Sequence, residues 1–230
     1  MKLSLKSRLA SVLSVLAVFV FVSCVDVDNP NVSTVDLRTL TKFVYLSSGS
    51  DNLQISVDGS VAATLPAAGE SEFLSLPAGN RKLKFQYNGN ASVDTPTVSF
   101  PQDVKGMFIC NYEPGSGMTK LDYQFIRSHT TYDGNVQYVP DKALVRFVNY
   151  SDVNAKMQLV AGAVTKSTGT VQYGNASAYD TVSVAPQYTI VDATTNSTLA
   201  QGTVGTSQGR YTVVLFGSGS SKAAKVIKED

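Results

Sequence analysis

A segment that occurs twice constrains the fold of this chain more than any other feature of its sequence. Leu40–Ser47 and Leu144–Ser151 match at an offset of 104 residues, with the Leu, Phe, Val and Ser of the two segments identical. Later in the chain, a segment that begins at Gly106 matches one that begins at Gly209, so the order is kept. The spacing predicts two domains of about 100 residues, each large enough to bury its own core.

Inside each copy, apolar residues recur at every second position. Leu53, Ile55 and Val57 alternate with polar residues, and the segments 83–87, 121–125 and 181–184 show the same alternation. Each such run has one apolar face and one polar face, as a strand of an antiparallel sheet requires. Turn signals such as Asp58-Gly59 and Asn88-Gly89 separate the runs, and no segment after residue 24 shows a helical apolar stripe. The pattern predicts an all-β chain made of two tandem antiparallel β-sandwiches.

The N-terminus has the form of a targeting segment. Lys2, Lys6 and Arg8 precede an apolar stretch, residues 9–22, which has the length of a signal-peptide core and is too short for a spanning helix. The segment Phe21-Val22-Ser23-Cys24 resembles a bacterial lipobox, in which the cysteine is acylated and becomes the first residue after cleavage. We therefore expect Cys24 to anchor the protein to a membrane. Removal of residues 1–23 would change the formal net charge from +1 to −2.

The residues after Cys24 bear on where the anchor faces. Asp26 and Asp28 resemble the short acidic export signal of Bacteroidetes surface lipoproteins. We expect an outer-membrane lipoprotein that faces the cell surface, and the alternative is an anchor that faces the periplasm. The expected organisation is a signal peptide (1–23), an acylated cysteine and flexible tether (24–38), a first sandwich (39–140, of which 111–140 includes the connection) and a second sandwich (141–230).

The repeated motifs resemble the bacterial envelope family known as domain of unknown function 4397. The resemblance is carried by Leu144–Ser151, by Leu76-Pro77-Ala78-Gly79 before an aromatic-rich strand, and by Gly209–Val214. It would cover residues 39 to about 227 as two copies, and it implies immunoglobulin-like sandwiches in a secreted or anchored protein. Members of the family often carry histidine where this chain has Tyr45 and Asn149. No histidine role is therefore carried over.

Residues that could support chemistry are sparse. The single histidine, His129, follows a strand-like run and has no nucleophile elbow near it, and Cys110 lies among alternating apolar residues that predict a buried core position. The acidic residues do not form a clustered metal-ligand set, and two cysteines cannot form a zinc cluster. The near-zero net charge without a basic block argues against nucleic-acid binding. We expect no catalytic residue, no metal, no cofactor and no nucleic-acid partner.

The chain contains 11 Tyr and no Trp, and some of these tyrosines lie on or beside polar turns. Exposed tyrosine can grip glycans or proteins, so the candidate binding aromatics are Tyr123, Tyr132, Tyr138, Tyr173 and Tyr179. The leading hypothesis is a non-catalytic, lipid-anchored envelope protein that acts as a binding or structural module. Its partner, besides the membrane, would be a glycan or another envelope protein. The alternatives are a glycan-binding accessory lipoprotein of a polysaccharide uptake system and a fimbrial subunit precursor cleaved near Arg38.

Overall fold

The described part of the chain is built from β-strands. The computed structural model describes residues 37–87, 91–94, 97–111, 121–130 and 140–230, with only the backbone described at 91–94 and 129–130. Within these ranges no helix is present, and Leu37–Asp230 forms one compact unit. The all-β prediction is confirmed.

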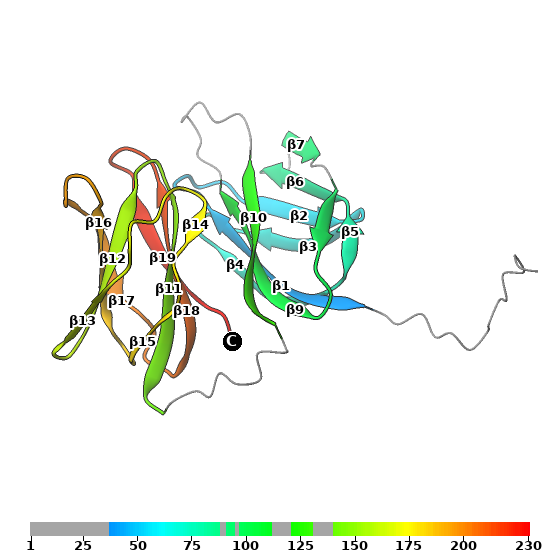
Figure 1. Ribbon diagram of the computed structural model, residues 1–230. Coiled ribbons are helices and arrows are strands. Elements are labelled where there is room, and N and C mark those ends of the chain that lie inside the picture. The colour runs from blue at the N-terminus through cyan, green and yellow to red at the C-terminus, as the bar shows by residue number, and fades with distance from the viewer. Residues whose placement is uncertain (1–36, 88–90, 95–96, 112–120, 131–139) are drawn as a thin grey trace, which may run out of the picture. The chain divides into compact units, whose positions relative to one another are not determined.

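The first half of this unit has two four-stranded sheets and a small additional one (Figure 1). One sheet, which we term the inner sheet because it contacts the other half, has the order β10 (Asp122–Thr130), β9 (Val104–Asn111), β1 (Arg38–Leu46), β4 (Glu70–Pro77). The outer sheet has the order β3 (Ser60–Leu65), β2 (Leu53–Val57), β6 (Leu83–Tyr87), β7 (Ala91–Asp94). The small sheet pairs β5 (Gly79–Arg81) with β8 (Val98–Phe100).

The second half repeats this strand order. Its inner sheet has the order β14 (Asn175–Ala176), β11 (Lys142–Ser151), β18 (Gly209–Gly217), β19 (Ala223–Lys228), and β15 (Asp180–Ser183) also pairs with β11. Its outer sheet has the order β13 (Val164–Ser167), β12 (Ala155–Ala161), β16 (Gln187–Asp192), β17 (Thr198–Thr203). The central strands β1 and β11 are the segments that match most closely in the sequence.

The strand pairing corrects one part of the sequence match. Thr41 pairs with Gly106, and Val145, which follows Thr41 by 104 residues, pairs with Tyr211. Gly106 therefore corresponds to Tyr211, whereas the sequence match had aligned it with Gly209. The shift is two residues, which is one full period of a strand, so the alternation of faces remained in phase and did not expose the error.

One strand pair in each half runs parallel, in contrast to the predicted antiparallel sheets. β1 pairs with β9 and β11 pairs with β18 in parallel, whereas every other described pairing is antiparallel. All nine residues of β18 are buried, and so are the last six of β1. Parallel pairs are typical of sheets that are covered on both faces, which explains why these strands read as continuous apolar runs.

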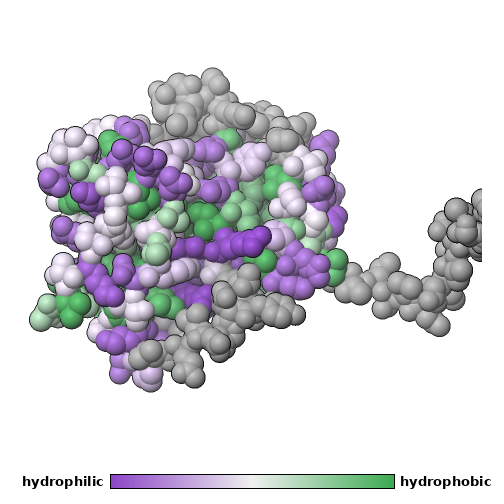
Figure 2. All heavy atoms as spheres, viewed as in Figure 1, coloured by the Kyte–Doolittle hydropathy of each residue, from purple (hydrophilic) through white to green (hydrophobic). Residues whose placement is uncertain are grey.

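The four main sheets enclose three apolar cores. One core lies between the two sheets of the first half and another between the two sheets of the second half. The third core joins the two inner sheets, because it combines residues of both halves: Val44, Leu46, Met107, Ile109 and Ile126 with Val148, Tyr150, Val214, Phe216 and Ile227. Full burial of one such side chain contributes about 1.5–3 kcal/mol to the stability of the fold. The contact between the two inner sheets therefore stabilises the molecule as the other two cores do. The solvent-facing surface mixes polar and apolar residues (Figure 2).

Candidate ligand-binding site

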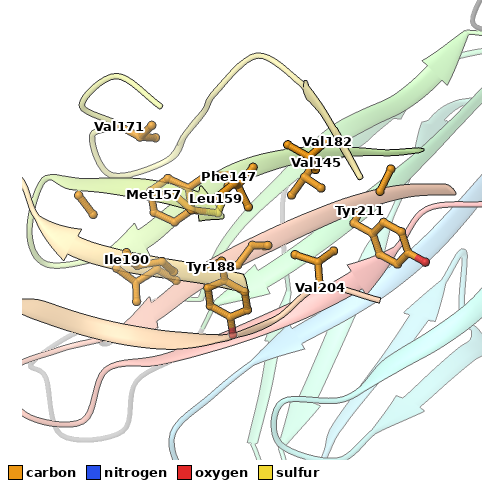
Figure 3. Packing of buried hydrophobic residues seen from close by; sticks show 14 residues of the cluster. Val145, Phe147, Met157, Leu159, Val171, Val182, Tyr188, Ile190, Val204 and Tyr211 are labelled. Atoms are coloured by element: carbon orange, nitrogen blue, oxygen red, sulfur yellow. The ribbon is translucent and has the colours of Figure 1, made fainter. Parts of the chain in front are cut away.

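A hollow of about 460 Å³ lies beside the connection between β13 and β14. Its lining combines small apolar residues with uncharged polar ones: Gly169, Thr170, Val171, Gln172, Asn175, Ala176, Ser177 and Ala178. Most of these side chains are exposed, whereas Val171 is buried and belongs to the core of the second half (Figure 3). The hollow therefore has a mixed polar and apolar surface without charge, which is fixed to the apolar core at Val171.

Asn149 holds this connection in place. It lies on β11 with no exposed surface, and its side-chain amide donates to the backbone oxygens of Val153 (2.7 Å) and Val171 (2.9 Å). Its side-chain oxygen accepts from the backbone N–H (2.9 Å) and the hydroxyl (2.7 Å) of Ser151. The backbone oxygen of Asn149 accepts from the N–H of Gly174 at 2.8 Å. A buried amide that is satisfied in this way gives the loop above it one defined position.

Ser177 fixes the other end of the hollow to the same strand. Its backbone N–H donates to the oxygen of Phe147 (2.8 Å), and the N–H of Phe147 donates to the Ser177 hydroxyl (2.9 Å). In the first half, the N–H of Phe43 donates to the Ser71 hydroxyl at the same distance of 2.9 Å. A hydrogen bond from the backbone N–H of this phenylalanine to a serine hydroxyl thus occurs in both copies and is not specific to the hollow.

The hollow itself is a feature of the second copy. Four residues (66–69) join β3 to β4, whereas seven residues (168–174) join β13 to β14. The position of Asn149 is occupied by Tyr45 in the first copy, and the ring of Tyr45 belongs to the core. The longer connection and the buried amide that organises it therefore occur together.

Tyr173 lies near the end of this connection, shortly before β14, and is 39% exposed. Its ring makes an edge-to-face contact with Tyr150, with 5.8 Å between the centroids, and its hydroxyl donates to Asp122. The Tyr150 hydroxyl donates to Gln124 at 2.7 Å, and burial raises the pKa of that hydroxyl above its ordinary value. Of the tyrosines selected from the sequence, Tyr173 is the one that lies in the segment forming the hollow.

The other selected tyrosines lie elsewhere. Tyr123 packs on the core of the first half, with its ring stacked on Phe108 at 5.6 Å. Tyr179 is half-buried and donates to Glu229 at 2.7 Å. Tyr132 and Tyr138 lie outside the described residues. The described tyrosines therefore do not form one common aromatic surface.

The remaining residues selected from the sequence lie in the first core, on β10 or outside the described residues. Cys110 is a free and fully buried thiol of the first core, and burial raises its pKa well above the ordinary value. His129 lies on β10, where only the backbone is described. Cys24, Asp26 and Asp28 lie outside the described residues.

Among the residues that the structure describes, no group of three or more His, Cys, Asp or Glu is placed to hold a metal ion. The same residues include no helix that is long and apolar enough to cross a membrane.

No protein-family model and no curated protein matches the sequence. Among solved structures, the chain is similar to CBMbc (family CBM26) of Eubacterium rectale Amy13K in complex with maltoheptaose, at 10% identity and a TM-score of 0.27, over 84% of this chain and 98% of that one. It is also similar to a proposed cell adhesion protein from Bacteroides uniformis (11% identity, TM-score 0.26, 84% and 99% covered). A third similar structure is a proposed polysaccharide-binding protein (DUF1812) from Bacteroides thetaiotaomicron (10% identity, TM-score 0.22, 84% and 98% covered).

Proposed function

We propose that this chain is a non-catalytic, lipid-anchored envelope protein whose second sandwich binds a neutral saccharide in the hollow at residues 169–178. The observation that carries the proposal is the lining of the hollow, which offers the uncharged polar side chains of Thr170, Gln172, Asn175 and Ser177 among small apolar residues and contains no charged residue. A neutral ligand rich in hydroxyl groups matches such a lining, because amides and hydroxyls can both donate and accept hydrogen bonds.

Two further features support a saccharide. Asn149 and Ser177 hold the connection before any ligand arrives, so binding would lose little conformational freedom. Tyr173 adjoins the lining residue Gln172 and is partly exposed, and a tyrosine ring offers an apolar face for a sugar ring together with a polar edge. The hollow is open and small, so we expect it to accept a few sugar units of a longer chain.

The test is calorimetric titration of the purified full-length protein with a panel of neutral oligosaccharides. Gln172→Ala, which removes an amide from the lining, is expected to weaken binding about tenfold, the equivalent of one or two hydrogen bonds. The matched control is Gln201→Ala, which removes an exposed amide from the edge strand β17. Equal binding by the two variants, or no binding by the unaltered protein, would refute the saccharide site.

The anchor and its location are part of the same proposal. Acylation of Cys24, with Asp26 and Asp28 as an export signal, would present the sandwiches on the outer surface of the outer membrane. The motif resemblance to the domain of unknown function 4397 family is consistent with such a location. Metabolic lipid labelling that requires Cys24, combined with protease shaving of intact cells, tests both points. Labelling that persists in Cys24→Ala would contradict the anchor, and protection from protease would place the protein in the periplasm.

The fold does not favour a fimbrial subunit precursor. β1 begins at Arg38 and is the strand between β4 and β9 in its sheet. Cleavage near Arg38 would therefore remove none of the described strands and would leave no groove in this sheet for the strand of another subunit.

A further inference from the structure

The two inner sheets meet through an apolar core at one end of their contact and through charged residues at the other. Four basic residues, one from each of the strands β1, β9, β11 and β18, form what we term the cationic cluster: Lys42, Lys105, Arg146 and Arg210. Figure 2 shows strongly hydrophilic residues near the middle of the visible face, where the two halves meet. No residue that lines the hollow belongs to the cluster.

Two members of the cluster have a carboxylate partner. Arg146 is 6% exposed and forms an ion pair with Glu229 at 3.1 Å, and it also donates to the Thr212 hydroxyl at 2.8 Å. Lys42 is 7% exposed and pairs with Glu70 at 3.4 Å. The charge of these two residues is therefore neutralised inside the protein.

Arg210 differs from them. It is 7% exposed, and its guanidinium donates to the backbone oxygen of Ser128 at 3.1 Å, but it has no ion pair with any described carboxylate. Its Nε has no hydrogen-bond partner in the described structure, and neither has the buried hydroxyl of Ser128. Its guanidinium also lies 5.9 Å from the centroid of the Tyr179 ring. This contact and the bond to Ser128 offset part of the cost of burial, but the Nε donor stays unused and no anion has been gained in exchange.

Lys105, on the inner sheet of the first half, is close enough to the Arg210 guanidinium for the two charges to interact. Its ammonium group sits over the Phe73 ring, 4.2 Å from the centroid, and it too lacks an ion pair among the described residues. Burial lowers the pKa of Lys105, and the nearby charges of Lys42 and Arg210 lower it further, although Asp230 and Glu229 oppose them. Lys105 is half-buried, so this member of the cluster is accessible from solvent.

We propose that Arg210 and Lys105 bind an oxyanion, a carboxylate, sulfate or phosphate group, at the seam between the two inner sheets. The Arg210 Nε would supply a directed donor, the Lys105 ammonium a mobile charge, and the Ser128 hydroxyl a neutral donor. The unpartnered, buried atoms on the two facing sheets carry the inference, since a bound oxyanion would satisfy them and neutralise the excess charge. The protein would then recognise acidic ligands at the seam and neutral ones at the hollow.

The test is calorimetric titration of the purified full-length protein with sodium sulfate, sodium phosphate and sodium galacturonate, each at constant ionic strength set with chloride. The three probes distinguish tetrahedral anions from a sugar carboxylate. Lys105→Gln is expected to weaken binding of the preferred probe about tenfold, whereas Lys156→Gln, which changes a half-buried lysine of the outer sheet strand β12, should leave it unchanged.

A second variant is expected to change the affinity for the oxyanion in the opposite direction. Asp230 lies 3.9 Å from Lys228 and acts on Lys105, so its carboxylate competes with an external anion. Asp230→Asn is therefore expected to tighten oxyanion binding. Lys105→Gln should leave any binding of neutral saccharides intact, which separates this site from the hollow. Saturable binding that is lost in Lys105→Gln alone supports the site, and equal binding by the two lysine variants, or no binding beyond chloride, overturns it.

Discussion

Replacement of Asn149 with alanine is expected to lower the free energy of unfolding by about 3 kcal/mol. The side chain makes two donor and two acceptor hydrogen bonds, and all of them lie in the fully buried surroundings of β11. Each bond contributes about 0.5–1.5 kcal/mol net. The cost for the two carbonyls lies at the lower end of this range, because Val171 also accepts from the Ala155 N–H at 3.1 Å. The Ser151 hydroxyl lies 3.3 Å from the Val153 carbonyl and can donate to it once Asn149 no longer accepts its proton. The backbone N–H of Ser151 would lose its partner in a buried position, which raises the total again.

The assay is urea denaturation followed by circular dichroism and by tyrosine fluorescence, since the chain has no Trp. With a denaturant slope of about 2–3 kcal/mol per molar urea, a loss of about 3 kcal/mol lowers the midpoint by about 1–1.5 M. Asn175→Ala removes an exposed side chain from the same hollow and should stay within about 0.5 kcal/mol of the unaltered protein. A loss below about 1 kcal/mol in Asn149→Ala would refute the claim that this amide holds the connection, and so would an equal loss in the two variants.

Two further predictions concern charged residues. Glu229→Ala leaves the guanidinium of Arg146 buried without its partner, and the expected loss is about 3–5 kcal/mol of unfolding free energy in urea. A loss below about 1 kcal/mol would show that this ion pair contributes little to stability. Partial burial raises the pKa of Asp152, but the Gly219 N–H at 3.0 Å and Lys222 at 2.7 Å outweigh this effect and leave it lowered. The stabilisation from Asp152 is therefore present above the ordinary carboxyl pKa and is lost as the pH falls through the lowered one. Asp152→Asn should flatten the acid side of a stability profile below about pH 4, and an unchanged profile would contradict the assignment.

Much of the fold was predictable from periodicity, and the reason is visible in the outer sheets. Leu83 and Phe85 face a core, whereas their neighbours Lys82 and Lys84 are exposed, so the alternation reports the fold directly. The inner strands gave no such signal. In the segment Phe43–Leu46 every residue is buried, because one face of the strand meets its own sandwich and the other meets the second half. A continuous apolar run shows that both faces are covered, but it does not show by what.

The candidate site was less accessible to sequence reasoning. The exposure of a tyrosine depends on tertiary packing, which is why Tyr123 lies against a core and Tyr173 lies at the hollow although both occur in polar surroundings of the sequence. The residue that organises the hollow, Asn149, was not selected. Its signal was present as a single amide inside the apolar run Phe147–Tyr150, at the position where the first copy has Tyr45. The seam was hidden altogether, because Arg210 becomes a buried cation only when the two inner sheets pack together.

The most direct test of the saccharide proposal is to map the binding surface by nuclear magnetic resonance. The ¹⁵N-labelled protein is titrated with the neutral oligosaccharide that binds most tightly in calorimetry, and the backbone amide shifts are followed residue by residue. The account predicts saturable shifts concentrated in residues 169–178 and at Tyr173. Shifts that concentrate on another surface, or amides that do not move at saturating saccharide, would contradict it.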